Sequence, residues 1–280
     1  MKRVFFLISL VLVFVLAGCN NNDQYAIERR YWQAQKQAEK IFKNPVATPN
    51  QQLINEVNTL NKFIKTYPQS NLAVDADLLI AKLYIVKEEY EAARQQLNLM
   101  HGKYAKYPDV AAEAIFYKGI SYEKQDKWGE ALNQYKKLMA EYPIALRGLD
   151  MPVYIAEHYR TAHQPDKMIA AYQEAAGHYR QLGEKYVDSP AGYNSYSLLV
   201  QCYLKIQDWQ NALDALNLVL EKYKGKVVLD GALMEKALIY YEGIKDNQKT
   251  KAVLEQLKQE YPKSKLSAAA DSLLKEISRK

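Results

Sequence analysis

The sequence is poor in residues that interrupt regular structure and in residues that carry most enzyme chemistry. Its 280 residues include only 11 Gly, 9 Pro, 4 His and 2 Cys. So few glycines and prolines exclude a collagen-like chain and argue against an all-β fold, which needs many turns. Hydrophobic residues make up 49% of the chain and charged residues 25%, a balance that excludes a disordered protein. We therefore expect a globular protein that is not all-β.

Charge of one sign is not concentrated anywhere in the chain. Lys and Arg number 38 and Asp and Glu number 32, which gives a net charge of +6. The two signs alternate throughout, as they do on solvated helix faces, whereas nucleic-acid binders gather basic residues on one face. We expect no nucleic-acid partner.

Motifs for catalysis, metal binding or phosphate binding are missing. The histidines lie at positions that do not repeat on one helical face: His101, His158, His163 and His178. There is no His-Glu-x-x-His, no cysteine cluster, no EF-hand loop, no glycine-rich phosphate loop and no nucleophile elbow. We expect a protein that is not an enzyme, without catalytic residues, metal ligands, cofactor or small-molecule substrate.

The N-terminus has the pattern of a secretory signal peptide. Lys2 and Arg3 form a basic start, and an apolar run from Val4 to Ala17 follows, broken only by Ser9. This run is shorter than the roughly 20 residues that a membrane-spanning helix needs. We therefore interpret residues 1–18 as a removable leader.

The leader ends in Leu16-Ala17-Gly18-Cys19. This tetrapeptide resembles the lipobox of bacterial lipoproteins. The resemblance implies cleavage before Cys19, a diacylglycerol on its sulfur and an acyl chain such as palmitate on its amine. We expect no cofactor besides this covalent lipid. Two or more acyl chains give stable anchoring in a membrane. The alternative is an ordinary signal peptide followed by an incidental cysteine.

The residues after Cys19 bear on location. In the sorting pattern of enteric bacteria an Asp at the next position favours the inner membrane, and Asn20 stands there instead. The resemblance thus implies a location in the bacterial cell envelope, on the outer membrane facing the periplasm. We interpret residues 19–24 as the lipidated cysteine and a polar tether.

Cys202 is the second cysteine. If Cys19 carries lipid, Cys202 has no partner for an intramolecular disulfide. It lies in the apolar stretch SLLVQCYL, so we expect a small buried side chain; the alternative is a reactive or intermolecular thiol.

Two markers recur along the chain. Tyr-Pro occurs at Tyr67, Tyr107, Tyr142 and Tyr261, and Tyr186 and Tyr223 fill the gap between the last two, giving intervals of 40, 35, 44, 37 and 38 residues. A bulky residue followed by alanine precedes most of them, with Tyr90, Trp128, Met168 and Trp209 as the bulky members. A fixed period of this length indicates stacked helix pairs.

The clearest unit spans residues 112–145. Gly119, Tyr122, Ala131, Tyr135 and Pro143 are spaced in it as in the tetratricopeptide repeat, which this unit resembles. The resemblance implies an all-α solenoid of five to six antiparallel helix pairs in a right-handed superhelix. Small residues such as Gly119 would lie where paired helices approach, and Pro143 would stop a second helix.

The repeats define the expected domain organisation. We predict an N-terminal helical segment over residues 25–50, a repeat array over 51–265 and a capping helix over 266–280. The two longest intervals predict second helices extended by about one turn before Tyr107 and Tyr186. Between residues 150 and 190 the distance from Tyr159 to Ala170 or Ala171 is two or three residues longer than the repeat spacing.

A curved stack of helix pairs presents a groove lined by first helices. Counting from the matched small residues gives the groove candidates Lys82, Phe116, Glu123, Lys124, Glu157, Arg160, Gln201 and Lys205. Charges would fix the register of an extended peptide or partner loop, and Phe116 would be an apolar anchor. The alternative is that these are solvated helix faces. The 23 tyrosines are explained by packing, although Tyr186, Tyr193 and Tyr196 could form a recognition surface.

A lipid anchor joined to a repeat array indicates a scaffold that binds protein partners. Cys19, the run Tyr67-Pro68-Gln69-Ser70 and the run Tyr261-Pro262-Lys263-Ser264 resemble the tetratricopeptide lipoproteins of the outer-membrane β-barrel assembly machinery. That resemblance implies a role in envelope assembly, with the barrel subunit and sister lipoproteins as partners. The alternatives are a secretion or pilus pilotin, an exopolysaccharide-export lipoprotein, and a cell-wall coordination factor of the Tol-Pal type.

Overall fold

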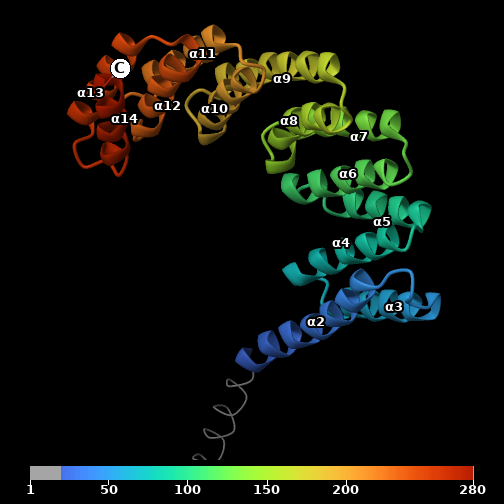
Figure 1. Cartoon of the computed structure of the whole chain (residues 1–280). Helices are drawn as coiled ribbons and strands as arrows, with labels where there is room; N and C mark the ends of the chain where they lie inside the picture. The colour runs from blue at the N-terminus through green and yellow to red at the C-terminus, as the bar shows by residue number, and fades with distance from the viewer. Residues whose placement is uncertain (1–19, 280) are drawn as a thin grey trace, which may run out of the picture. The chain divides into compact units, whose positions relative to one another are not determined.

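A computed structural model describes residues 20–279, which form helices and turns without a strand in that range (Figure 1). The contacts divide the chain into two compact units, residues 1–138 and 139–280. The boundary lies near the end of helix α7, and we describe each unit by itself. The leader 1–18 and Cys19 lie outside the described residues.

The first unit is a series of helices in which neighbours along the chain pack on each other. Its helices are α2 (Asn20–Lys43), α3 (Asn50–Thr66), α4 (Asn71–Val86), α5 (Tyr90–Lys103), α6 (Pro108–Glu123) and most of α7 (Trp128–Glu141). Helix α2 packs on both α3 and α4, while α5 packs on α4 and α6. The apolar side chains that these contacts bury include Ala38, Leu60 and Ile80.

The second unit follows the same plan. Its helices are α8 (Leu146–Thr161), α9 (Pro165–Lys185), α10 (Pro190–Lys205), α11 (Trp209–Lys222), α12 (Asp230–Leu238), the π-helical turn η1 (Ile239–Ile244), α13 (Asn247–Glu260) and α14 (Ser267–Arg279). Helix α14 packs on α13 and covers the last pair. The predicted all-α solenoid of helix pairs is thereby confirmed within each unit.

Helix α2 starts earlier than the sequence analysis expected. Residues 20–24, interpreted as a tether, are the first residues of this helix. The helix ends at Lys43, and the segment with Pro45 and Pro49 turns the chain into α3, as proline requires. The prediction of a separate polar tether is therefore corrected, because the polar residues here continue the helix.

The five pairs from α4–α5 to α12–α13 are each joined by a turn whose central residue is left-handed but is not glycine. These residues are Glu88, Asp126, His163, Gln207 and Lys245, with φ between 54° and 64°. In the first four turns the next amide donates to the carbonyl of a tyrosine five residues back, as Glu89 does to Tyr84 at 2.9 Å. This is the Schellman arrangement, which satisfies the last carbonyls of a helix. The recurring tyrosines of the first helices thus mark where each helix ends.

A second set of tyrosines marks the ends of the second helices and corrects the repeat register. The residues that directly follow these helices are Tyr67, Tyr104, Tyr142, Tyr186, Tyr223 and Tyr261. Tyr104, and not Tyr107, is thus the repeating residue. Tyr107 precedes α6, and Pro108 is the first residue of that helix, where its missing amide costs nothing. The predicted extension of α5 is therefore wrong, since α5 has the same 14 residues as α7.

The repeat register of the α8–α9 pair also differs from the prediction. Its turn residue is His163, so Pro165 occupies the position of Trp128 and Trp209, and Met168 occupies the position of Ala131. Assigning Met168 as the bulky residue was wrong by three positions. Helix α9 has 21 residues against 14 in α7 and α11, so it is extended by about two turns.

Burial settles the role of several single residues. A Cβ atom at Gly119 would lie 2.2 Å from Cε1 of Tyr135, so glycine is required for the close approach of α6 and α7. Cys202 is fully buried, and burial raises the pKa of its thiol to about 12. It is the small buried residue that the sequence predicted. Tyr196 is also fully buried and is therefore not part of a recognition surface.

Candidate partner-binding surfaces

The first unit contains a pocket that two of the predicted groove residues line. It has a volume of about 370 Å³ and lies among residues of α2, α4, α5 and α6. Its walls are largely apolar, with Phe42, Ile85, Val86 and Ile120. Lys82 and Lys124 also line it, while Glu88 and the two tyrosines Tyr90 and Tyr117 complete it. We call this the α4–α6 pocket.

Contacts within the pocket hold its polar groups in place. The ammonium of Lys82 lies 4.7 Å from the centre of the Tyr117 ring, a cation–π geometry. The Tyr90 hydroxyl donates to the carbonyl of Lys124 at 3.2 Å. Lys82 and Lys124 thus both line the pocket beside its apolar walls. Such an arrangement suits an apolar side chain that carries or adjoins a carboxylate.

Phe116 does not belong to this pocket. It is 8% exposed, and its ring centre lies 6.1 Å from that of Tyr135 and 5.2 Å from that of Tyr117. The expectation that Phe116 is an apolar anchor in a groove is corrected, because α6 turns this ring into the core. Ile120, one turn further along α6, is at the pocket instead.

Two buried tyrosines of second helices each donate to a glutamate on the preceding first helix. The Tyr135 hydroxyl donates to Glu123 at 2.6 Å, and the Tyr172 hydroxyl donates to Glu157. The hydrogen bond to Tyr172, followed by that to Arg160, holds the pKa of Glu157 below its usual value. Burial and the bond to Glu157 raise the pKa of Tyr172. The core beneath Glu157 thus favours the charged form of that glutamate.

In the second unit, four predicted groove residues make polar contacts along and between the first helices. Arg160 donates to Glu157 on α8, and the Lys205 ammonium of α10 lies 3.4 Å from the same carboxylate. Gln201 of α10 donates to Glu235 of α12 at 2.7 Å. Burial raises the pKa of Glu235, and the bond from Gln201 opposes this. The first helices α8, α10 and α12 therefore share a polar strip.

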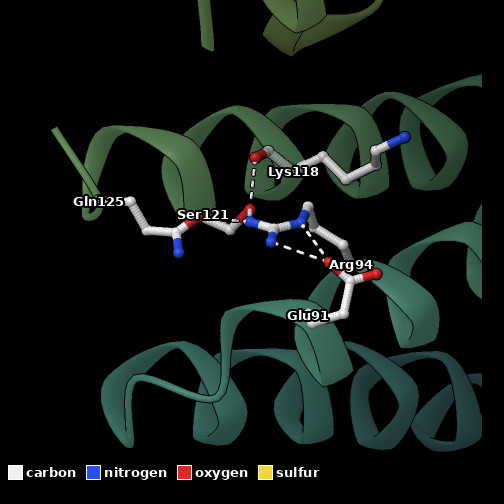
Figure 2. Close-up of polar contacts among 5 residues, drawn as sticks. All are labelled: Glu91, Arg94, Lys118, Ser121 and Gln125. Carbon is white, nitrogen blue, oxygen red and sulfur yellow. Dashed lines mark hydrogen bonds and ion pairs between the residues drawn. The ribbon is translucent and has the colours of Figure 1, made fainter. Parts of the chain in front are cut away.

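Sequence reasoning missed the polar contacts that join second helices to the following first helices. Figure 2 shows the guanidinium of Arg94 on α5 between Glu91 and α6, where it donates to Gln125 at 2.8 Å and to Ser121 at 3.5 Å. The same guanidinium lies 4.5 Å from the centre of the Tyr122 ring. An arginine on a second helix has no sequence signal of its own, because its partners are set by the packing.

Asp77 is a second missed residue. It is 6% exposed on α4 and accepts from Gln96, Lys103 and Tyr104 at 2.9, 2.7 and 2.6 Å. All three donors lie on or just after α5. A buried carboxylate with three donors is a structural link, so Asp77 fastens α4 to α5 and is not available to a ligand.

The Tyr-Pro-x-Ser runs have a structural role. The Ser70 hydroxyl accepts from the amide of Leu72 at the start of α4, and Ser264 accepts from Leu266 at 3.0 Å before α14. Ser70 is the N-cap residue of α4 and stabilises the beginning of that helix, whereas Ser264 stabilises the turn before α14. The runs therefore mark the passage from one pair to the next.

Among residues 20–279 there is no group of three or more His, Cys, Asp and Glu side chains that could hold a metal ion. Within that range no helix combines the length and apolar character needed to cross a membrane.

Comparison with protein families finds a match to three of the helix pairs. The tetratricopeptide repeat family matches residues 113–143, 196–225 and 232–264. These segments correspond to α6–α7, α10–α11 and the α12–α13 pair with its π-helical turn. Each of the three segments is similar to one tetratricopeptide repeat. Repeats of this kind stack into extended surfaces that bind proteins.

Solved structures with similar architecture include the TPR2AB-domain:pHSP90-complex of yeast Sti1, with 17% identity, coverage of 89% of this chain and 98% of that chain, and a TM-score of 0.35. BtubC from P. vanneervenii is 14% identical, with coverage of 84% and 90% and a TM-score of 0.40. NprR in complex with its cognate peptide NprX is 15% identical, with coverage of 86% and 82% and a TM-score of 0.30. No curated protein sequence matches this chain.

Proposed function

We propose that the protein is a lipid-anchored scaffold of the bacterial cell envelope that holds an extended segment of a partner protein in the α4–α6 pocket. The observation that carries the proposal is the pocket itself, where Lys82 and Lys124 stand beside an apolar floor on neighbouring first helices. Tetratricopeptide repeats stack into surfaces that hold partner proteins, which supports a binding role.

The chemistry of the pocket specifies the partner segment. An aliphatic or aromatic side chain would bury its surface against Ile85, Val86 and Ile120, and an adjacent carboxylate would face the two lysines. Glu88 at the rim would repel a second acidic group, so one carboxylate is better accommodated than a run of them. We therefore propose an extended segment with an apolar residue next to an acidic residue or a C-terminal carboxylate.

Charge reversal at the pocket tests this proposal. Lys82→Glu with Lys124→Glu should abolish capture of the partner after mild crosslinking in cells, because both ammonium groups become repulsive to a carboxylate. The matched control is Lys65→Glu with Lys106→Glu, which reverses two exposed lysines outside the pocket. The control should capture the partner as the unchanged chain does. Equal capture by the pocket variant would contradict the proposal.

Lipid attachment is tested separately. Cys19 ends a lipobox-like tetrapeptide, and we propose that it carries the lipid that holds the protein to the outer membrane in the periplasm. The mass of the protein extracted from membranes should exceed that of the chain from residue 19 by a diacylglycerol and an acyl chain. Cys19→Ala should remove this excess and release the protein. An unmodified mass would contradict the anchor and leave the pocket proposal standing.

The identity of the captured protein distinguishes the envelope roles. We favour envelope assembly, in which an outer-membrane barrel-assembly subunit would be captured and depletion would lower porin levels. Capture of a secretin would indicate a pilotin, an export channel would indicate exopolysaccharide export, and a peptidoglycan-bound protein at the division site would indicate a cell-wall factor.

A further inference from the structure

One face of α2 is directed away from the rest of the first unit and carries aromatic and basic side chains. Ala34, Ala38 and Ile41 are buried against the neighbouring helices and fix the rotation of α2 about its axis. Successive residues of a helix are turned by about 100°. This places a stripe opposite the buried residues. The α2 stripe consists of Tyr25, Arg29, Trp32, Lys36 and Lys43, all of them exposed.

The aromatic members of the α2 stripe are unusually open to solvent for their size. Tyr25 is 67% exposed and Trp32 is 52% exposed. The ammonium of Lys36 lies 3.8 Å from the centre of the Trp32 ring. Burying these rings in the core of the unit is impossible without turning Ala34 and Ala38 outward, because the two sets lie on opposite sides of the helix. The stripe is therefore available to something outside the unit.

The composition of the stripe matches a membrane surface. Tryptophan and tyrosine prefer the boundary between headgroups and acyl chains, where the ring is half in an apolar medium and the polar atom stays wet. Lysine and arginine bind anionic headgroups and extend their charged ends to water. The stripe has three basic residues. The exposed Glu28 and Glu39 lie along one edge and Lys40 along the other, so this face keeps a net positive charge that is complementary to anionic lipid.

We propose that the α2 stripe lies on the headgroup surface of an anionic bilayer, with α2 parallel to the membrane plane. Helix α2 begins one residue after Cys19, so its placement in the cell rests on the proposed lipid anchor. Along the helix axis Tyr25 lies about 8 Å from Asn20, the first residue of α2, and Lys43 about 35 Å. A lipid at Cys19 would thus hold one end of the stripe at the surface, and the stripe would fix the orientation of the unit above it.

Vesicle binding tests the stripe without the lipid anchor. The chain from Asn20 to Lys280, which retains every described residue, is sedimented with vesicles of phosphatidylglycerol and phosphatidylethanolamine, and with vesicles of phosphatidylcholine alone. We expect binding to the anionic vesicles, with Trp32 fluorescence moving to shorter wavelength in a Trp128→Phe, Trp209→Phe background. We expect no binding to phosphatidylcholine. Each basic side chain at such a surface strengthens binding roughly fivefold, and added salt weakens it.

Matched variants assign the binding to α2. Arg29→Gln with Lys36→Gln and Lys43→Gln should weaken vesicle binding on the order of 100-fold. The control, Lys224→Gln with Lys251→Gln and Lys275→Gln, removes the same charge from exposed positions of the second unit and should bind as the unchanged chain does. Tyr25→Ser with Trp32→Ser should weaken binding several-fold and keep its salt dependence.

Two outcomes would overturn the inference. One is equal loss in the α2 variant and the control, which would mean that net charge alone drives sedimentation. The other is an α2 variant that still binds vesicles as the unchanged chain does but no longer captures a crosslinked protein in cells. That result would make the stripe a protein-docking surface. Because the chain used here carries no lipid, either result is independent of the mass measurement at Cys19.

Discussion

The backbone of Gly119 lies against the ring of Tyr135, so closely that a Cβ atom at Gly119 would be 2.2 Å from the ring carbon Cε1. Tyr135 is fully buried and donates its hydroxyl to Glu123. The ring cannot withdraw without breaking that bond. One contact therefore sets the distance between α6 and α7 and the position of a predicted groove residue.

Adding a methyl group at this contact should destabilise the protein. We expect Gly119→Ala to lower the free energy of unfolding by about 1–3 kcal/mol, because the ring and the helix must move apart. Thermal and urea unfolding followed by circular dichroism measure this. Gly129→Ala is the control: a Cβ at Gly129 would meet nothing within 4 Å, and alanine is the better helix former. A loss at Gly129 equal to that at Gly119 would contradict the account.

The left-handed turn residues should be sites where glycine stabilises. Gln207 has φ of 57°, a conformation that costs a residue with a side chain roughly 1–2 kcal/mol. Gln207→Gly should raise the free energy of unfolding by about 0.5–1 kcal/mol once the flexibility of glycine is deducted. Gln210→Gly, three residues on inside α11, should instead lower it by about 1 kcal/mol. Opposite signs at the two positions are the result to look for.

Removing one hydroxyl should loosen the link between α4 and α5. Tyr104→Phe takes away the 2.6 Å hydrogen bond to buried Asp77 and should cost about 1–2 kcal/mol of unfolding free energy. Tyr107→Phe is matched in chemistry, but Tyr107 is 57% exposed, so it should change stability by less than about 0.5 kcal/mol. If the two variants unfold alike, Asp77 does not hold the helices as described.

Glu56 should make stability depend on pH. It is 5% exposed on α3, its Oε1 atom has no hydrogen-bond partner, and burial raises its pKa to about 7. The unfolded chain releases this proton near pH 4.5, so between the two values the folded state binds more protons. Stability is then full below about pH 4.5 and falls as pH rises to about 7, by on the order of 3 kcal/mol.

Substitution separates this contribution from that of other groups. Glu56→Gln cannot lose a proton, so its free energy of unfolding should fall less between pH 4.5 and pH 7 than that of the unchanged chain. Glu39→Gln, at an exposed position of α2, should retain the full dependence. Parallel pH curves for the unchanged chain and Glu56→Gln would show that Glu56 is not the group responsible.

The architecture could be predicted from the sequence because the recurring residues lie where the backbone ends a helix or where two helices approach closely. Tyr84, Tyr122, Tyr159 and Tyr203 supply the carbonyls that close the turns of the pairs, and Gly119 is fixed by a close approach. The predicted register was wrong where two short segments resemble a repeat marker at a different position. Tyr107-Pro108 copies the end of a second helix but starts α6, and Met168-Ile169-Ala170-Ala171 copies the Trp128 segment three residues too late.

The candidate site was predictable only in part. Counting along the first helices placed Lys82 and Lys124 at one pocket, and linked Glu157 with Arg160 and Lys205. Phe116 was misplaced because position along a helix does not say how far the helix is rotated into the core. The roles of Arg94 and Asp77 could not be found, since the partners that link them to other helices lie 19 or more residues away.

The most direct test of the central claim is site-specific photo-crosslinking in cells, with a photoreactive residue placed at Ile120 on the floor of the α4–α6 pocket or at Leu99 on α5. Leu99 is 69% exposed and apolar but does not line the pocket. We expect one specific protein adduct from position 120, lost when Lys82→Glu and Lys124→Glu are added, and none from position 99. Adducts of equal amount from both positions, or an adduct at 120 that survives charge reversal, would contradict the claim.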